Sequence, residues 1–214
     1  MAQMGRPRTF DRDVAIDQAL HLFWEHGFDA TSLSQLKAHI GGGITAPSFY
    51  AAFGSKQALF VEVMERYLKT HGRVTDSLFD NSLPPREAIE RTLRRSAKMQ
   101  WEAGHPKGCL VALGFLSACT EESKAISAPL AQARADNRAG ILACVERAIA
   151  AGELPTTVMP DALASVYDSF MLGMSVLARD GVPFEQIDQA VTQLMGLWDA
   201  LRVTDPVLVD DQPV

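Results

Sequence analysis

A short segment near residue 50 carries side chains that could contact the bases of DNA. Phe49 and Phe53 are four residues apart, so on a helix both would face inward. The residues around them are small or polar. Threonine and serine hydroxyls can bond to base edges or phosphates, and an alanine methyl can touch a thymine methyl group. The outward-facing candidates are Thr45, Ala46, Ser48 and Tyr50.

Neighbouring groups suit the DNA backbone. The Tyr50 hydroxyl and the Lys56 ammonium are donors of the kind that hold phosphates. Ser55 is placed to cap the next helix, whose N-terminal N–H groups and partial positive charge would act at the same spot. The alternative for each residue is an ordinary solvated side chain. Further candidates for phosphate or minor-groove contact are Lys37 and, on an N-terminal arm, Arg6 and Arg8.

Three short helices are predicted to position these groups. Apolar residues at helical spacing predict a first helix over residues 12–26. A second helix starts at a Thr-Ser cap and ends at Gly41-Gly42-Gly43, and a third covers residues 46–53. A long helix over residues 55–80 follows. This order is a helix-turn-helix with a connecting helix, and its dominant use is to place a short helix in the major groove of DNA.

The remainder of the chain also predicts helices, with no strand-like alternation. We therefore expect an all-α protein of about nine helices. A helix-turn-helix domain would cover residues 1–56, a larger helical domain residues 57–202, and a mobile tail residues 203–214. After the connecting helix, the expected helices cover residues 86–102, 109–119, 129–151, 161–179 and 183–201.

Charge is unevenly distributed along the chain. The net charge is −6, which alone argues against nucleic acid. Residues 1–72 hold seven Lys or Arg and seven Asp or Glu, so the whole acidic excess lies in residues 73–214. No acid occurs between Ala30 and Val61. A basic tip on an acidic body suits a modest DNA contact, although ordinary surface variation would give the same balance.

The sequence indicates a cytoplasmic protein with no cofactor and no metal. The first eight residues have no apolar run after their charges, which argues against a signal peptide. The longest apolar run, around residues 109–116, is too short to cross a bilayer. The three cysteines, Cys109, Cys119 and Cys144, are odd in number and widely spaced. That pattern favours a reducing compartment over a disulfide framework, and it has no metal-ligand spacing.

Three motifs in the first 60 residues form one ordered pattern. They are Gly5-Arg6-Pro7-Arg8, then Ala19 to Ser32, then Ile44 to Phe60. Together they resemble the N-terminal domain of TetR/AcrR-type transcriptional regulators, and the resemblance is specific because it joins three helices in register. That family is all-helical, usually dimeric, and generally represses transcription until a small molecule binds its C-terminal domain. Carried over residue by residue, the family's usual DNA contacts fall near Thr31, Lys37, Thr45, Ala46, Ser48, Tyr50 and Lys56.

One departure from the family pattern concerns the turn. The family usually has a single glycine there, whereas this chain has Gly41-Gly42-Gly43, about two residues more. Three glycines are expected to loosen the turn, because glycine has more conformational freedom than any other residue. The recognition helix would then be less fixed before DNA binds.

The resemblance implies that the last two long helices form the dimer, as a four-helix bundle across a twofold axis. Their apolar faces fit this role, and the alternative is that the same faces fill the core of one protomer. A twofold axis predicts a palindromic operator with half-sites one helical turn, or a multiple, apart. The expected interface residues are Leu163, Val166, Phe170, Gly173, Met174, Leu177, Ile187, Val191, Leu194 and Trp198.

The resemblance also implies an effector pocket, which we expect mainly among the helices over residues 86–151. Methionine and aromatic side chains suit an apolar or aromatic ligand, and they equally suit a plain helical core. The expected lining is Met99, Trp101, Cys109, Leu113, Phe115, Leu116 and Tyr167.

Cys109 has a distinctive setting within this region. It follows a loop that holds His105 and Lys107 and lies where a helix begins, which favours the thiolate. It could therefore sense an electrophile or an oxidant, as some members of one branch of the family do with a similar Gly-Cys. The alternative is a small buried cysteine. Cys119 or Cys144 could pair with it only within disulfide reach.

Three functional hypotheses follow. The first is a homodimeric DNA-binding repressor that a small apolar or electrophilic effector releases from a palindromic operator. The second keeps the fold but makes the protein an activator or a constitutive DNA binder. The third is a thiol-dependent enzyme with Cys109 as nucleophile and His105 as base. No third orienting group is apparent for an enzyme, and residues 31–60 would be left unexplained, so we expect a regulator.

Overall fold

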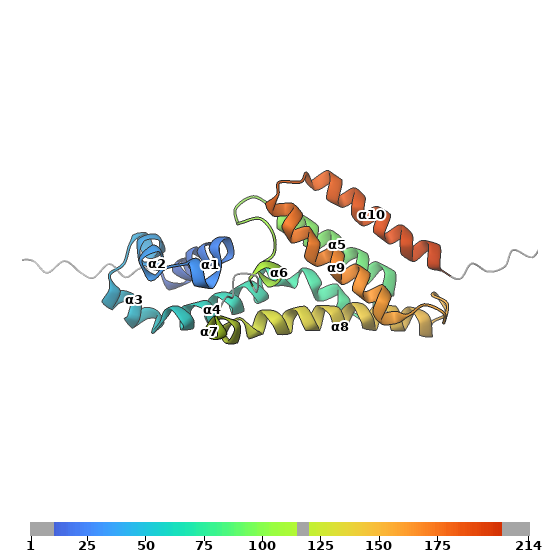
Figure 1. Ribbon diagram of the computed structural model, residues 1–214, viewed down its shortest axis with the longest axis horizontal. Coiled ribbons are helices and arrows are strands. Elements are labelled where there is room, and N and C mark those ends of the chain that lie inside the picture. Colours follow the sequence, from blue (N-terminus) through green and yellow to red (C-terminus); the bar gives the residue numbers. More distant parts are fainter. Residues whose placement is uncertain (1–10, 115–119, 203–214) are drawn as a thin grey trace, which may run out of the picture.

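The computed structural model describes residues 11–114 and 120–202, and within these ranges every regular element is helical, which confirms the all-α prediction (Figure 1). The elements are the α-helices α1 (Arg12–Ala30), α2 (Leu33–His39), α3 (Ala46–Phe53), α4 (Lys56–Lys69), α5 (Pro85–Trp101), α6 (Leu110–Leu113), α7 (Glu121–Ile126), α8 (Ala128–Ala150), α9 (Pro160–Arg179) and α10 (Phe184–Leu201), and the 3-10 segments η1 (Ile40–Gly42) and η2 (His71–Phe79).

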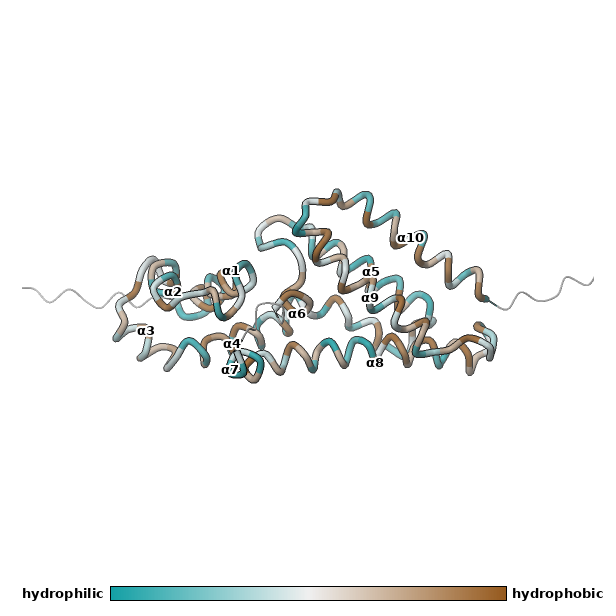
Figure 2. Tube along the Cα trace, viewed as in Figure 1, coloured by the Kyte–Doolittle hydropathy of each residue, from teal (hydrophilic) through white to brown (hydrophobic). Residues whose placement is uncertain are grey.

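The molecule is elongated, with the three N-terminal helices at one end and the long helices of the body at the other (Figure 1). Helix α4 runs from the first group into the second, and α8 lies along one side of the body. Hydrophobic and hydrophilic residues alternate along each long helix (Figure 2), as expected for helices with one buried face. None of the helices in the described ranges is long and apolar enough to span a bilayer.

Two hydrophobic clusters hold the fold together. The first joins α1 to α4, where Phe23 packs edge-on against Phe60 with ring centroids 4.9 Å apart. The second joins α5, α8, α9 and α10 around Tyr167 and Trp198, both fully buried. The first cluster continues past residue 56 to Tyr67, so α4 packs with the N-terminal helices as well as leading into the body.

The predicted long helix over residues 55–80 is wrong in one respect. The α-helical part ends at Lys69, Thr70 leaves helical geometry at φ −119° and ψ −89°, and the chain continues as the 3-10 segment η2. The Thr70 hydroxyl donates to the carbonyl of Arg66 at 2.8 Å, and Gly72 follows. A threonine that bonds back to the preceding turn and a glycine both weaken a helix, which accounts for the break.

A second difference concerns the segment after Cys109. The expected helix over residues 109–119 is short: α6 ends at Leu113, and residues 115–119 lie outside the described ranges. Helix α7 was not predicted. Its N-cap is Thr120, whose side chain and that of Ser123 each accept an N–H of the other residue, so a capping box starts this six-residue helix.

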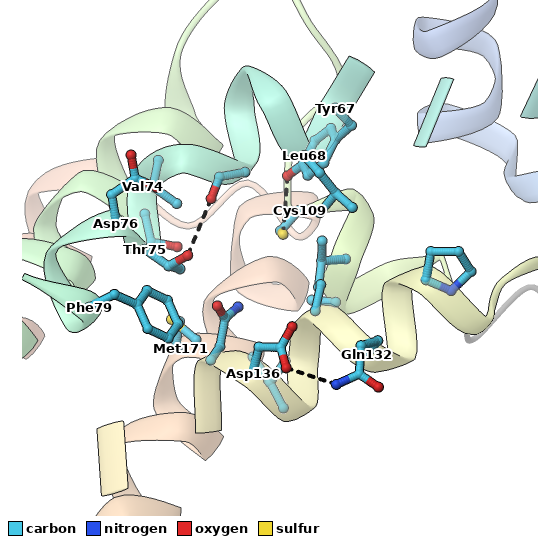
Figure 3. Close-up of a pocket in the computed structure, with 18 of the residues that line it drawn as sticks. Tyr67, Leu68, Val74, Thr75, Asp76, Phe79, Cys109, Gln132, Asp136 and Met171 are labelled. Carbon is cyan, nitrogen blue, oxygen red and sulfur yellow. Dashed lines mark hydrogen bonds between the residues drawn. The ribbon is translucent and has the colours of Figure 1, made fainter. Parts of the chain in front are cut away.

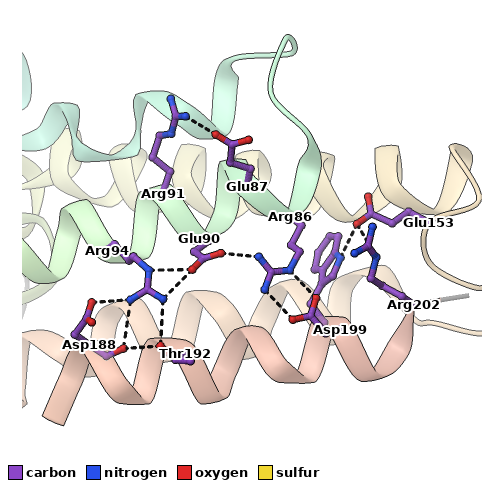
Figure 4. A network of polar contacts seen from close by, with 11 residues as sticks. Arg86, Glu87, Glu90, Arg91, Arg94, Glu153, Asp188, Thr192, Asp199 and Arg202 are labelled. Atoms are coloured by element: carbon purple, nitrogen blue, oxygen red, sulfur yellow. Dashed lines mark hydrogen bonds and ion pairs between the residues drawn. The ribbon is translucent and has the colours of Figure 1, made fainter. Parts of the chain in front are cut away.

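An ionic network joins α5 to α10 on the outside of the body (Figure 4). Arg86 donates to both carboxylate oxygens of Asp199, at 2.6 and 2.8 Å, and to Glu90 at 2.5 Å. Arg94 donates to Glu90 and, at 2.6 Å, to Asp188. The hydrogen bonds from Arg86 lower the pKa of Asp199. Partial burial raises the pKa of Glu90, but its bonds to Arg94 and Arg86 outweigh burial and hold that pKa below its usual value.

This network should make the protein sensitive to acid. A carboxylate whose pKa is lowered by folding contributes stability that is present above its unfolded pKa and is lost as the pH falls through its folded pKa. We therefore expect the free energy of unfolding to decrease when the pH is lowered past about 4.5. Glu90→Gln should lower the free energy of unfolding by only about 1 kcal/mol at pH 7, because the network is partly exposed. The same variant should make the free energy of unfolding depend less on pH in the acidic range. Urea unfolding between pH 7 and pH 3 measures both.

The matched control is Glu87→Gln on the same helix. Among the described residues Glu87 forms an ion pair only with Arg91, one turn along α5, and such exposed pairs contribute about 0.3–0.5 kcal/mol. Equal losses in the two variants would contradict a bridging role for Glu90.

Candidate nucleic-acid interface and small-molecule pocket

Helix α3 has the orientation predicted for a recognition helix. Phe49 and Phe53 are buried, whereas the Tyr50 side chain is half-exposed. Thr45 caps the helix by accepting the N–H of Ser48 at 3.3 Å, and the two hydroxyls lie 3.0 Å apart. Part of the hydrogen-bonding capacity of Thr45 is therefore used within the helix. Ser48 and Tyr50 present their polar groups outward.

The three-glycine turn has a defined geometry in the structure, and the expected looseness before DNA binding stays a prediction. Gly41, Gly42 and Gly43 have φ values of 59°, 72° and 98°, a left-handed region that favours glycine. The N–H of Gly41 donates to the side-chain oxygen of Gln18 on α1 at 2.8 Å, and that of Ile44 donates to the carbonyl of Lys37 at 2.8 Å. The turn is thus tied to α1 and to α2, and it fixes where α3 begins.

Lys56 begins α4, beside the end of α3. Its ammonium lies 4.2 Å above the centre of the Phe28 ring, a cation–π contact that holds the side chain in place. Partial burial lowers the pKa of Lys56, whereas Asp29 and Glu122 raise it. Ser55 caps the helix by accepting the N–H of Ala58 at 3.0 Å, as predicted. The charged group and the helix N-terminus therefore lie together.

Thr31 does not have an accessible side chain, so its predicted DNA contact is wrong for this conformation. The residue is completely buried, and its hydroxyl donates to the carbonyl of Gly27 at 2.7 Å. Gly27 has φ 78° and interrupts α1, so Thr31 satisfies a carbonyl that the break exposes. Lys37 and Ala46 are partly exposed. Arg6 and Arg8 lie outside the described residues.

A cavity of about 580 Å³ opens between η2, α5, α8 and α9 (Figure 3). Its apolar wall includes Val111 and Met171, and its polar groups come from three helices and η2. Both kinds of side chain converge, as in many small-molecule sites. The lining comprises Tyr67, Leu68, Gly72, Val74, Thr75, Asp76, Phe79, Ser96, Gln100, Cys109, Val111, Ala112, Pro129, Gln132, Ala133, Asp136, Asn137, Ala139, Met171 and Leu172.

Of the described residues predicted to line a pocket, only Cys109 lines this cavity. Met99 is buried and borders a different, shallower groove. Trp101 donates its ring N–H to the carbonyl of Val182 at 2.6 Å and packs against the body core. Leu113 borders a small cavity of about 310 Å³ next to the end of α1. These three predictions are wrong for the main cavity.

The remaining predicted lining residues divide in two. Tyr167 is fully buried in the second hydrophobic cluster, so that prediction is also wrong. Phe115 and Leu116 lie outside the described residues. The actual walls come largely from η2 and α8, whose facing surfaces depend on tertiary packing.

Cys109 lies beside Tyr67, whose hydroxyl donates to the sulfur at 3.1 Å (Figure 3). Burial raises the pKa of the Cys109 thiol, although the hydrogen bond from Tyr67 and those from the backbone of Ala112 and Val111 pull it down. The thiol is therefore predominantly protonated at neutral pH. The prediction of a helix-stabilised thiolate is wrong in its net direction.

The polar loop before Cys109 does not activate the thiol. The ring nitrogen Nδ1 of His105 bonds to the carbonyl of Pro106 at 2.9 Å, and the Lys107 ammonium donates to the carbonyls of Trp101 and Glu102. Neither side chain contacts the sulfur, which removes the geometric basis for a Cys–His nucleophile. Cys144 donates to the carbonyl of Leu78 at 3.6 Å inside the second cluster. Cys119 is outside the described residues.

Trp24 of α1 connects the N-terminal helices to the cavity wall. Its ring stacks on His105 with centroids 4.6 Å apart and packs edge-on against Tyr67 at 4.8 Å. Arg179, at the end of α9, donates to the carbonyl of Trp24 at 2.7 Å and to the carboxylate of Glu25 at 3.0 Å. Tyr67 thus touches the cavity, Cys109 and α1 at once. A change at the cavity has a short physical route to the N-terminal helices.

Helices α9 and α10 also have an apolar face that the protomer does not cover. Val166, Leu177 and Leu197 are each about 40% exposed. A side chain added at Gly173 or Gly196 would meet nothing within 4 Å, so both glycines face open space. Among the predicted interface residues, this uncovered face retains Val166, Phe170, Gly173, Leu177 and Leu194, which are exposed or partly exposed.

The other predicted interface residues fill the core of their own protomer, so those predictions are wrong. Both helices are apolar on two sides, and the sequence pattern does not separate the inner side from the outer one. Trp198, for example, is fully buried and donates its ring N–H to Glu153 at 3.0 Å. The buried residues are Leu163, Met174, Ile187, Val191 and Trp198.

Comparison with known proteins places this geometry in context. Residues 15–63 match a family model described as bacterial regulatory proteins of the tetR family. The chain is 30% identical over 198 residues to ComR of Escherichia coli (strain K12), an HTH-type transcriptional repressor, and the match covers 92% of this chain and 93% of ComR. BdcR of the same organism, also an HTH-type transcriptional repressor, is 36% identical over 113 residues, 53% of this chain and 56% of BdcR.

A solved structure gives the same result. It contains a cysteine mutant of the TetR family transcriptional regulator CifR with a 26-base-pair double-stranded operator DNA, and it is 36% identical in sequence with a TM-score of 0.78. The similarity covers 90% of this chain and all of that chain. From the helix-turn-helix at one end, the helical body at the other and the extent of these matches, we conclude that this chain belongs to the tetR family of bacterial regulatory proteins.

Proposed function

We propose that the protein is a homodimeric transcriptional repressor that acts in the cytoplasm and leaves a palindromic operator when a small effector binds its body. The observation that carries the proposal is α3, which is anchored by Phe49 and Phe53 and presents Ser48 and Tyr50 outward. The relatives named as repressors, and the CifR mutant solved with operator DNA, support the same activity.

The DNA contacts would be divided between reading and positioning. Ser48 and Ala46 would face base edges. Tyr50 and Lys56 would hold phosphates of the DNA backbone. Thr45 and Lys37 would contribute from the two sides of the turn between α2 and α3. We place the DNA-binding domain at residues 1–56 and the effector-binding and dimerisation domain at residues 57–202, with α4 packing against both.

Repression would be relieved by a shift between two conformations. An effector that fills the 580 Å³ cavity would contact Tyr67, which touches Trp24 of α1. Moving Tyr67 would move α1, and with it the spacing of the two recognition helices in the dimer. The effector needs only to bind the conformation with the DNA-free spacing more tightly than the conformation that fits DNA.

The direct test is binding of the purified protein to the DNA that flanks its own gene, at low and moderate salt. A repressor should bind a palindrome there tightly and in a salt-sensitive manner. A reporter driven by that DNA should be silenced by the protein. Activation of the reporter would favour the activator hypothesis, and silencing that no ligand relieves would favour a constitutive binder.

Lys56→Ala should weaken binding to all DNA sequences by about three- to tenfold, because it removes a phosphate contact. The slope of log affinity against log salt should become shallower by about one per protomer. Lys98→Ala is the matched control, since Lys98 is exposed on α5 in the body. A loss confined to the operator, with an unchanged salt slope, would refute a phosphate-binding role.

An electrophilic effector is a second candidate, favoured by the position of Cys109 in the cavity wall. The raised pKa of Cys109 predicts slow reaction with N-ethylmaleimide at pH 7 and faster reaction as the pH rises. Tyr67→Phe should slow the reaction further, by about threefold at pH 8, because it removes a hydrogen bond that stabilises the thiolate. Mass spectrometry of the Cys109 peptide measures the rate, and Cys109→Ser is the control. Faster modification of Tyr67→Phe would contradict this account.

A further inference from the structure

We infer that the effector cavity selects an amphipathic cation, a protonated amine or quaternary ammonium attached to an apolar or aromatic body. This inference rests on the proposed function and names the ligand class of the same cavity. Among the described residues that line the cavity, the formally charged ones are Asp76 and Asp136, and none is Lys, Arg or His. An anionic ligand would therefore meet two carboxylates and no cation in this lining.

Asp136 is the carboxylate best placed to recognise a cation. It projects from α8 toward the cavity (Figure 3), and one oxygen accepts a hydrogen bond from the side chain of Gln132 at 2.8 Å. It makes no ion pair within the described ranges. Asp76, by contrast, pairs with Arg73 at 2.9 Å. Asp136 therefore keeps its charge available to a ligand.

The arginines that flank Asp136 on α8 are directed elsewhere. Arg134 donates to the carbonyl of Val111 at 2.6 Å, and Arg138 pairs at 2.9 Å with the buried carboxylate of Asp168. Neither guanidinium lines the cavity. No cation in the described lining therefore competes with a ligand for Asp136, and an uncompensated carboxylate attracts cations.

The remaining walls suit the apolar part of such a ligand. Phe79 is 56% exposed, although large aromatic residues are usually well buried, and its ring lies at the cavity (Figure 3). Val111 and Met171 supply an apolar floor. A cation within about 6 Å of an aromatic ring gains further attraction from the ring face. A head group that reaches both Asp136 and the Phe79 ring, with the apolar body against Val111 and Met171, would use both features.

The opposite charge lies on the other side of η2. A groove of about 480 Å³ is lined by His71, Arg73, Arg95 and Lys98, with Glu102 as its one acidic residue. Arg95 and Lys98 are exposed. An anionic molecule would therefore meet a more favourable charge in that groove than in the cavity.

The test uses three probes with the same phenyl group on a four-carbon chain: 4-phenylbutylamine, 4-phenylbutanol and 4-phenylbutyrate. At pH 7.5 they are cationic, neutral and anionic. Calorimetric titration of the full chain without DNA should give about tenfold tighter binding for the amine than for the alcohol, and weaker binding for the carboxylate. Asp136→Asn should bring the amine to within about twofold of the alcohol and leave the alcohol unchanged. Glu146→Gln, an exposed acid on the same helix but outside the lining, should change nothing.

Three results would overturn the inference: equal binding of the amine and the carboxylate, an amine preference that survives Asp136→Asn, or no binding of any probe to a cavity with room for all three. Because the titrations contain no DNA, these failures leave the repressor proposal standing. Binding to the flanking DNA tests that proposal separately. Alcohol binding without an amine preference would keep the effector cavity and reject only the ligand class.

Discussion

A Leu197→Glu variant should be monomeric and should bind its operator roughly one hundredfold more weakly than the natural protein, because a dimer gains from engaging two half-sites at once. Leu197 is 39% exposed on α10, and Leu177 is 38% exposed on α9. In a twofold dimer each residue occurs twice around the axis, so the substitution places two carboxylates in an apolar contact. Burying unpaired charges there costs more than the contact gains.

Sedimentation velocity gives the oligomeric state, and gel-shift titration gives the affinity. The protomer fold should be retained, because Leu197 lies on the side of α10 that the protomer leaves open, and circular dichroism checks this. Ala143→Glu, at an exposed position of α8, introduces the same charge away from the proposed interface and should remain dimeric. A Leu197→Glu protein that is still dimeric would move the interface to another surface.

A Gly42→Val variant should lose about 2 kcal/mol of stability in the N-terminal helices and bind DNA roughly thirtyfold more weakly. The cause is backbone geometry, not crowding. Gly42 has φ 72°, and a side chain there would meet nothing within 4 Å. A β-branched residue resists that conformation, so the turn would relax and α3 would shift relative to α1.

The control for this effect is Gly42→Asn, because asparagine tolerates left-handed geometry better than other side chains. It should lose less than half as much stability as Gly42→Val. Thermal unfolding of the two variants and their affinities for the flanking DNA measure the difference. Equal losses would show that the strain lies elsewhere, for example in the bond between Gly41 and Gln18.

The N-terminal motif was largely predictable because its signals are local. The caps at Ser32, Thr45 and Ser55 all form as the residue types predicted. The prediction for Thr31 was wrong because the direction of its side chain depends on a break in the preceding helix. Its position in the motif suggested contact with DNA, but the break at Gly27 turns its hydroxyl inward.

The body was less predictable because its functional surfaces depend on which side of each helix faces a neighbour. Helices α9 and α10 are apolar on two sides, so residues of the inner core such as Val191 could not be separated from those of the open face such as Leu197. The cavity lining depends on the change from α4 to η2 at Thr70, which turns Thr75, Asp76 and Phe79 toward α8. A pattern search for one continuous helix does not find that change of register.

The stacking of Trp24 on His105 has an optical consequence. Indole emission is quenched by an imidazole ring in van der Waals contact, and more strongly when that imidazole is protonated. Trp24 lies on α1 where the N-terminal helices meet the body, whereas Trp101 and Trp198 both pack within the body. With phenylalanine at those two positions, fluorescence would come from Trp24 alone. The intensity of Trp24 fluorescence would then report, without an added label, whether the N-terminal helices and the body are in contact at His105.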